Sequence, residues 1–417
     1  MQLDDRPRRS KRTRENHPRS FALGFVDQGF SSATNLGLVL LAGRALGPSG
    51  LGAVALGIAA YLTCLGFQRA LISEPLVARS STVGSNGRPE WTNRALSVAI
   101  IAAATGATFL AAGGLVVGGG LGASLVLFAI WLTPALLQDF WRAVLFRDGR
   151  AVSATTNDGA WLFAMAAAAP AAWVIGTQWA VISCWGLGAL VGAALGFVQT
   201  SARAARAAVA FAWWRRELWP FGRWLGAGSL VYASLSVVTA VALVAILGQH
   251  DYGGLQAVVT VYAPLSLIGP AIVLPGLPVV SRALASSESS ARRLVHRLAL
   301  SIAALTTLYV VLVNIGGGVV LTTLFGRSFE SFKDIGWPIG IGQIAAGIGI
   351  AFGLLLMARR QGAAVFSAGT LGSATSLGLS SSLAALSGTV GAAWGLSAGS
   401  AVGAAATTTF ALKRWPN

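Results

Sequence analysis

Charged residues are scarce in this sequence. They make up 11% of its 417 residues, whereas an ordinary soluble domain carries roughly 25%. Hydrophobic residues reach 55%, and the mean hydropathy is +0.69. A water-soluble chain of this length could not bury so much apolar surface in its own core. Because lipid offers the backbone no hydrogen bonds, the sequence predicts an all-α integral membrane protein.

Groups that ligate metals or attack substrates are also rare. The chain has two cysteines and three histidines, and none stands at metal-ligand spacing or beside a carboxylate cluster. GxGxxG-like strings occur only in glycine-rich apolar runs that follow no predicted strand, so they do not indicate a nucleotide site. The sequence therefore predicts no catalytic residues, no metal and no cofactor, and it disfavours an enzyme.

Twelve apolar runs are long enough to cross a bilayer, which takes about twenty helical residues each. They cover 21–45, 51–72, 95–117, 121–144, 153–175, 179–199, 221–247, 255–280, 298–324, 335–357, 363–386 and 391–412. We expect a basic tail at 1–20, a six-helix lobe at 21–199, a linker at 200–220, a second six-helix lobe at 221–412 and a short tail at 413–417.

The distribution of the net charge of +16 supports this topology and argues against a nucleic-acid partner. Basic residues stand singly or in short clusters between apolar runs, as in loops that orient a membrane protein. With the N-terminus inside, the inner loops carry the arginine clusters, and the outer ones only Arg44, Arg327 and Lys333. We therefore expect a multi-pass protein of a bacterial cytoplasmic membrane, with both termini cytoplasmic.

The two halves of the chain are similar when one is shifted by about two hundred residues. The shift pairs Gly47 with Gly248, Gly52 with Gly253, Tyr61 with Tyr262 and Leu76 with Leu277. Each glycine pair borders a turn between two apolar runs. The pattern predicts a parallel internal repeat about an axis normal to the membrane.

Polar and ionisable groups inside the predicted spans are the candidates for a substrate site. Each charge costs about 2.5–3.5 kcal/mol to insert, so it usually faces a cavity or a partner. The candidates, all in the first half, are Asp27, Gln28, Asn35, Arg69, Glu74, Asp139, Arg142 and Asp158. Together they predict one hydrated vestibule in the first lobe. Interface anchoring, helix capping and inter-helix bonding are alternatives that the sequence leaves open.

The predicted eighth span, 255–280, is unusual in its prolines. It contains Pro264, Pro270, Pro275 and Pro278. Each proline removes a backbone donor and bends a helix. A gate or hinge and a kinked packing helix are both compatible with this pattern.

Several strings resemble the bacterial lipid-linked oligosaccharide flippases, the polysaccharide-transport branch of the multidrug/oligosaccharidyl-lipid/polysaccharide (MOP) exporter superfamily, which includes the MATE transporters. They are Asp27-Gln28 with Ser31 and Asn35, GPSGLG at 47–52, SEPLVAR at 73–79, LQDFWRAVLFRDGR at 137–150 with Asp158 and Trp161, and LFGRSF at 324–329. The second half matches mainly in topology. The resemblance implies a MATE-like fold whose two lobes open alternately to either side.

The resemblance implies a flippase or exporter of a lipid-linked oligosaccharide or polysaccharide precursor. Arg69 and Arg142 would then attract the diphosphate, and the acids would contact sugar hydroxyls or a coupling H⁺ or Na⁺. The implied partners are the bilayer, the lipid-linked glycan, and a glycan polymerase or glycosyltransferases. The family's cavities are often cationic, whereas here the acids equal or outnumber the bases. A cation-coupled multidrug exporter and a non-transporting scaffold of a glycan-assembly complex remain as alternatives.

Overall fold

The computed structural model describes residues 17–80, 87–266 and 268–413, and within these ranges it is almost wholly helical with no strand. The elements are α1 (His17–Gln68), the π-helical turn η1 (Arg69–Ser73), α2 (Glu74–Ser80), α3 (Arg88–Val117), α4 (Gly119–Arg147), α5 (Ala151–Ile175), α6 (Gln178–Thr200), α7 (Ala207–Glu217), α8 (Trp219–Val261), α9 (Ala263–Ser266), α10 (Ile268–Ser286), α11 (Glu288–Phe325), the 3₁₀ segment η3 (Arg327–Ile335), α12 (Gly336–Ala358) and α13 (Gly362–Leu412).

Three of these helices are hairpins of two arms. The chain leaves helical geometry at Gly47 in α1 (φ 68°), Gly248 in α8 (φ 80°) and Gly388 in α13 (φ 62°). Glycine tolerates this left-handed backbone at no steric cost. Counting α1, α8 and α13 as two arms each, taking α9 and α10 together with the second arm of α8, and adding α3, α4, α5, α6, α11 and α12 gives twelve arms among the described residues, the number that the sequence predicts.

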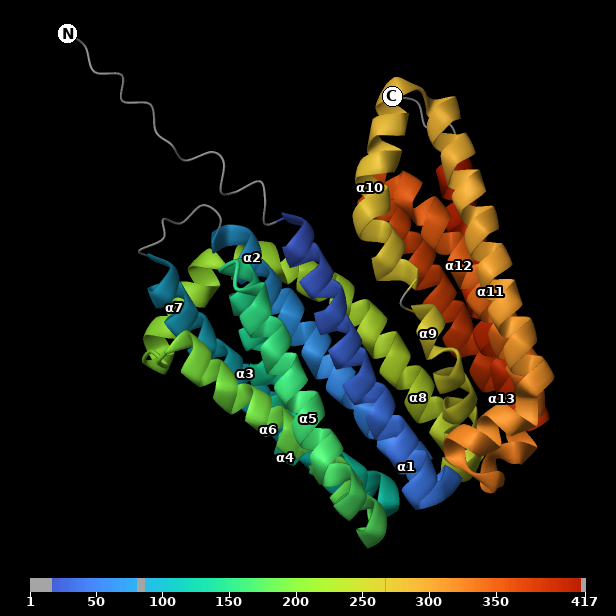
Figure 1. The fold of residues 1–417 in the computed structure, drawn as a ribbon, viewed down its shortest axis with the longest axis horizontal. Helices are drawn as coiled ribbons and strands as arrows, with labels where there is room; N and C mark the ends of the chain where they lie inside the picture. The colour runs from blue at the N-terminus through green and yellow to red at the C-terminus, as the bar shows by residue number, and fades with distance from the viewer. Residues whose placement is uncertain (1–16, 81–86, 267, 414–417) are drawn as a thin grey trace.

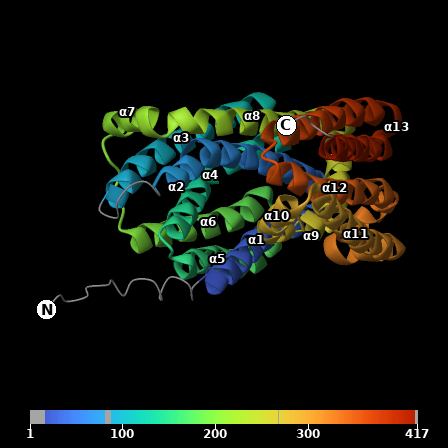
Figure 2. The same ribbon diagram turned by 90° about the horizontal axis from the view of Figure 1, so that it is seen from above.

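The arms form two bundles that diverge from a shared end. Figure 1 shows α1 to α7 on one side and α9 to α13 on the other, converging where α1 and α8 reverse direction. Seen from above, α8 runs along one edge of the molecule and α1 lies nearer the middle, both reaching from the first bundle toward the second (Figure 2). The first arm of α1 begins, and the second arm of α13 ends, at the end where the bundles are far apart.

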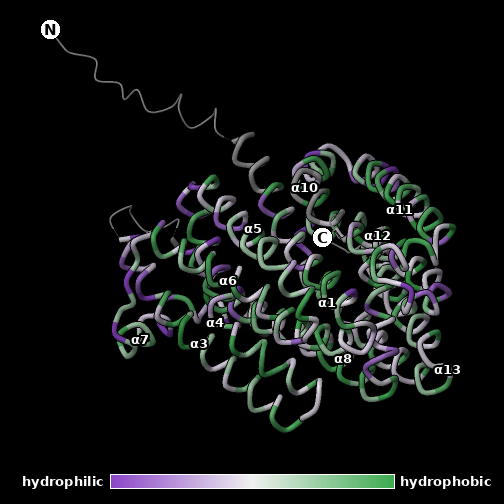
Figure 3. The backbone as a smooth tube through the Cα atoms, turned by 60° about the horizontal axis from the view of Figure 1, so that its bottom comes forward, coloured by the Kyte–Doolittle hydropathy of each residue, from purple (hydrophilic) through white to green (hydrophobic). Residues whose placement is uncertain are grey.

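The surface of the bundles is suited to lipid. Among the described residues, eight helical segments are long and apolar enough to cross a membrane, although that number takes Val26–Arg79 as one segment and omits α13. Hydrophobic residues run along the helices, and hydrophilic ones gather around α7 and nearby helix ends (Figure 3). The protein therefore has the fold class predicted for it, that of an all-α, multi-pass membrane protein.

The predicted repeat coincides with the contact between the bundles. A Cβ atom on Gly52 would overlap the carbonyl oxygen of Gln249, and one on Gly253 would overlap that of Pro48. The two contacts are equivalent under the shift that pairs Gly52 with Gly253. Because Gly52 and Gly253 have no side chains, the backbones of α1 and α8 can come into direct contact.

The predicted eighth span is not one helix. α8 ends at Val261, and the short α9 separates it from α10. Pro264 lies in α9, and Pro270, Pro275 and Pro278 lie in α10. Proline cannot donate to the preceding turn, which accounts for a break at this point. The side chains of Pro264 and Pro278 are exposed.

The predicted linker contains α7, which packs on the first lobe. Pro75 has no N–H to donate to the carbonyl of Leu71, and that carbonyl accepts from Trp214 Nε1 at 3.0 Å instead. Trp213 is 3% exposed and stacks edge-on against Trp91. At the tails, His17, Pro18 and Arg19 belong to α1, while residues 1–16 and 414–417 lie outside the described residues.

Candidate functional site

Five of the predicted site residues form one buried ionic cluster in the first lobe. Asp27 comes from α1, Arg69 from η1, Asp139 and Arg142 from α4, and Asp158 from α5. The side chains of Asp27, Asp139 and Asp158 are 0%, 8% and 3% exposed. Four helical elements thus bring together charges that lie far apart in the sequence.

Arg142 is the centre of the cluster. Its Nε donates to Asp27 Oδ2 and lies 3.5 Å from Asp158 Oδ2, and its Nη2 donates to Gln28 Oε1 at 3.2 Å. Its Nη1 is 3.9 Å from Asp139 Oδ1, so the pairing expected along α4 is the longest of its ion pairs. One guanidinium therefore holds α1, α4 and α5 together.

Arg69 forms the second half of the cluster with Asp139. Its Nε donates to both carboxylate oxygens, at 3.0 and 3.1 Å, and its Nη2 also contacts Oδ1. Arg69 opens the π-helical turn, a wide turn that is frequent at functional sites. Since the Arg69 side chain is 40% exposed, this end of the cluster is accessible.

The cluster holds three carboxylates and only two guanidinium groups. Asp27 Oδ1 and Asp158 Oδ2 are buried and have no hydrogen-bond partner among the described residues. Buried oxygen atoms without a partner are costly, and a surplus negative charge in low dielectric is more so. The arrangement can therefore accept one proton or one monovalent cation beside Arg142.

A chain of buried amides extends the cluster. Gln138 Nε2 donates to Asn157 Oδ1 at 3.1 Å and also to Asp158, and Asn157 Nδ2 donates to Gly192 O at 2.8 Å. Sequence reasoning did not place these amides in the site. The adjacent pairs Gln138-Asp139 and Asn157-Asp158 were the available signal, because a polar neighbour of a buried charge tends to share its partners.

A cavity of about 420 Å³ opens beside the ionic cluster. Arg69, Glu74, Asp139 and Arg142 line it, and Glu74 is exposed. Asn35 lies two turns further along α1 and is half-buried, and within the described residues no hydrogen bond joins it to the cluster.

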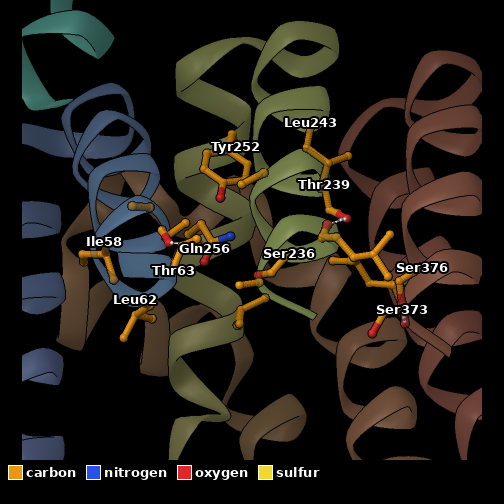
Figure 4. Close-up of a pocket in the computed structure, with 17 residues that line it drawn as sticks. Ile58, Leu62, Thr63, Ser236, Thr239, Leu243, Tyr252, Gln256, Ser373 and Ser376 are labelled. Carbon is orange, nitrogen blue, oxygen red and sulfur yellow. Dashed lines mark hydrogen bonds between the residues drawn. The ribbon is translucent and has the colours of Figure 1, made fainter. Parts of the chain in front are cut away.

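A second cavity, of about 480 Å³, lies between the two bundles and was not predicted (Figure 4). None of the described residues that line it is charged. Its polar side chains are Thr63 on α1, Ser236, Thr239, Tyr252 and Gln256 on α8, and Ser373 and Ser376 on α13. The spacing of three or four residues within each helix places them on one face, which was a readable but weak signal.

Comparison with solved structures shows which fold this is. The chain is similar to a multidrug resistance MATE family transporter of the MOP superfamily in an inward-facing conformation (TM-score 0.73, 11% identity, 91% of this chain and 93% of the other). It is similar to the lipid II flippase MurJ in an inward closed conformation (0.70, 12%, 95% and 88%). For an outward-facing multidrug resistance MATE family transporter the TM-score is 0.58, at 11% identity over 94% of both chains.

No protein-family model and no curated protein matches the chain. At 11–12% identity, the likeness to these structures establishes the fold alone. The predicted MATE-like architecture is therefore confirmed, with the fold of MOP superfamily transporters.

Proposed function

We propose that the protein moves a lipid-linked oligosaccharide or a similar glycan precursor across a bacterial cytoplasmic membrane by alternating access. The observation that carries the proposal is the cavity between the bundles. Its lining is uncharged and sets seven hydroxyl or amide side chains among ten apolar residues, and the polar groups suit the many hydroxyls of a sugar chain. Its position between the diverging bundles would expose it to one side of the membrane at a time.

The termini would lie in the cytoplasm, so that the bundles are open toward it. The larger TM-score with the inward-facing structure, 0.73 against 0.58, supports this orientation. The arginine-rich loops lie at that end as well, in agreement with the positive-inside rule. A glycan polymerase or glycosyltransferases would deliver or consume the substrate as partners.

Energy would come from an ion gradient, and the ionic cluster of the first lobe would couple transport to it. Arg69 and Arg142 are both paired with carboxylates, so they are less available to a diphosphate than two free arginines would be. The third carboxylate of the cluster, which no arginine balances, instead suits a coupling H⁺ or Na⁺, which would bind as the lobes change orientation. A diphosphate would meet Arg69 first, since Arg69 is the more exposed of the two.

The same surplus of acid supports a second candidate, a cation-coupled multidrug exporter. Three carboxylates around two guanidiniums attract a cationic substrate as well as a coupling ion. In that case the uncharged cavity would hold the apolar part of the drug.

Transport in proteoliposomes separates the two candidates. A fluorescent polyprenyl-diphosphate oligosaccharide and the cationic dye ethidium are offered in parallel, with and without a proton or sodium gradient. Ser236→Leu fills the central cavity, and Ser301→Leu, at an exposed position of α11, is the matched control.

We expect gradient-dependent movement of the glycan that is lost in Ser236→Leu and retained in Ser301→Leu. Movement of ethidium alone would favour the exporter. Equal glycan transport by both variants would contradict the role assigned to the cavity between the bundles.

A further inference from the structure

A third cavity lies where α3 and α5 begin and α4 and α6 end, and we refer to it as the arginine cavity. It measures about 290 Å³. Its lining includes Arg88, Thr92, Arg147, Asp148, Arg150 and Ser201. It shares no lining residue with the cavity beside the ionic cluster or with the cavity between the bundles. The ends of four helices in the first lobe thus enclose a separate polar space.

The arginine cavity carries an excess of positive charge. Three guanidinium groups line it, and Asp148 is its one carboxylate among the described residues. Arg147 Nε donates to Asp148 Oδ1 at 2.8 Å, and its Nη2 donates to Thr92 Oγ1 at 2.9 Å. Asp148 therefore balances one arginine and leaves the charges of Arg88 and Arg150 uncompensated within the cavity.

Two of these arginines have buried donors without a partner. The side chain of Arg147 is 4% exposed, yet its Nη1 makes no hydrogen bond to any described residue. The Nε of Arg88 is also buried and unpaired in the described part of the chain. An unpaired N–H of a cation is more costly than an unpaired neutral donor. An acceptor that entered the cavity would therefore satisfy the donors of Arg88 and Arg147.

Two further hydrogen bonds tie together the segments that form the wall of the cavity. Arg150 Nη1 donates to Gln199 O at 2.7 Å, which ties the start of α5 to the end of α6. Asn93 Oδ1 accepts from the backbone N–H of Arg203 at 2.8 Å, which ties the linker to α3. The guanidinium groups of Arg147 and Arg150 are thus positioned by the fold before any ligand arrives.

We propose that the arginine cavity binds a phosphate group. The forked donors of arginine match phosphate oxygens, and an anion would satisfy the unpaired N–H groups. The volume admits a phosphate with a small organic substituent. Two sources share this chemistry, namely the headgroup of an anionic phospholipid and a soluble phosphate ester.

Thermal unfolding of the delipidated full-length protein in neutral detergent tests the proposal. The probes are inorganic phosphate, glycerol 3-phosphate and short-chain phosphatidylglycerol, with phosphatidylcholine and matched sodium chloride as blanks. The variant is Arg88→Gln/Arg150→Gln. Arg215→Gln/Arg216→Gln removes the same charge from exposed positions of α7 and is the control. Size-exclusion elution verifies that each variant is folded, and Arg150→Gln alone replaces the double variant if it is not.

We expect saturable stabilisation of the wild type and of the control, with affinity reduced about tenfold for each guanidinium removed from the cavity. Stabilisation by phosphatidylglycerol alone would identify a lipid headgroup, and stabilisation by glycerol 3-phosphate or phosphate a soluble ligand. The proposal is overturned if no phosphate probe stabilises the wild type, or if the cavity variant responds as the control does.

Discussion

Gly52 and Gly253 make the same backbone contact from opposite sides of the junction between the bundles. Each lies where a Cβ atom would overlap a carbonyl oxygen of the other helix, that of Gln249 for Gly52 and that of Pro48 for Gly253. Two equivalent contacts between rigid helices form a natural pivot, because neither side offers a side chain that could move away.

We predict that Gly52→Ala separates the bundles at this pivot. The added methyl group meets backbone atoms and not a flexible side chain. We therefore expect the free energy of unfolding to fall by about 1–3 kcal/mol, seen as a lower melting temperature in detergent. Gly66→Ala is the control, because a Cβ there meets nothing within 4 Å. Equal melting temperatures for both variants would contradict the contact.

The ionic cluster predicts strong coupling between Arg142 and Asp27. Arg142→Gln leaves two buried carboxylates facing each other, at a cost of about 3–5 kcal/mol. Asp27→Asn/Arg142→Gln removes one of those charges and should recover part of the loss. A double-mutant cycle on apparent unfolding free energies measures this, and additive effects would show that the two side chains do not interact.

We predict that Arg44 joins the two bundles as a latch at the end where they meet. It lies on α1, and its Nε donates to Leu324 O at 2.8 Å near the end of α11, whose last carbonyls lack helical partners. We expect Arg44→Ala to raise the population of outward-open molecules about tenfold. The readout is labelling of Thr63→Cys by an impermeant thiol reagent in a Cys64→Ser/Cys184→Ser background.

The matched control for the latch is Arg327→Ala, an exposed arginine in the neighbouring η3. It should leave the labelling rate unchanged. If both variants label equally fast, the loss of positive charge at this end of the protein explains the effect, and the latch does not.

We predict that the break between α8 and α10 acts as a gate during transport. Pro264→Ala restores a backbone donor at a position where proline disfavours a helix by about 3 kcal/mol, so α8 should extend toward α10. We expect slower transport with unchanged expression, measured in the proteoliposome assay. Pro134→Ala, inside the continuous α4, is the control, and equal transport rates in the two variants would mean that α9 only packs.

The sequence was sufficient for the positions of most helices, but not for the break within the predicted eighth span, and it was insufficient for the partners of the buried charges. The apolar runs and glycine turns are local signals, and they located the reversals at Gly47 and Gly248. The pairing of Arg142 with Asp27 spans 115 residues and depends on how three helices pack. The local pair on α4, Asp139 with Arg142, was foreseeable and is the looser one.

The central cavity escaped prediction for a different reason. Serine and threonine in a membrane helix also serve helix packing, so Ser236 and Ser373 could not be distinguished from structural residues. Only the juxtaposition of α1, α8 and α13 in space gives them a shared cavity.

The contact between the two arms of α13 involves no charge, unlike the ionic cluster of the first lobe. Gly372 packs on Gly403, Gly399 on Ser376 and Gly395 on Ser380, so small residues line most of the seam. Cohesion there depends on short-range dispersion, which ionic strength does not screen. The two arms of α13 should consequently keep their contact in high salt or a changing membrane potential, while the buried ionic cluster of the first lobe is a part that an electric field can act on.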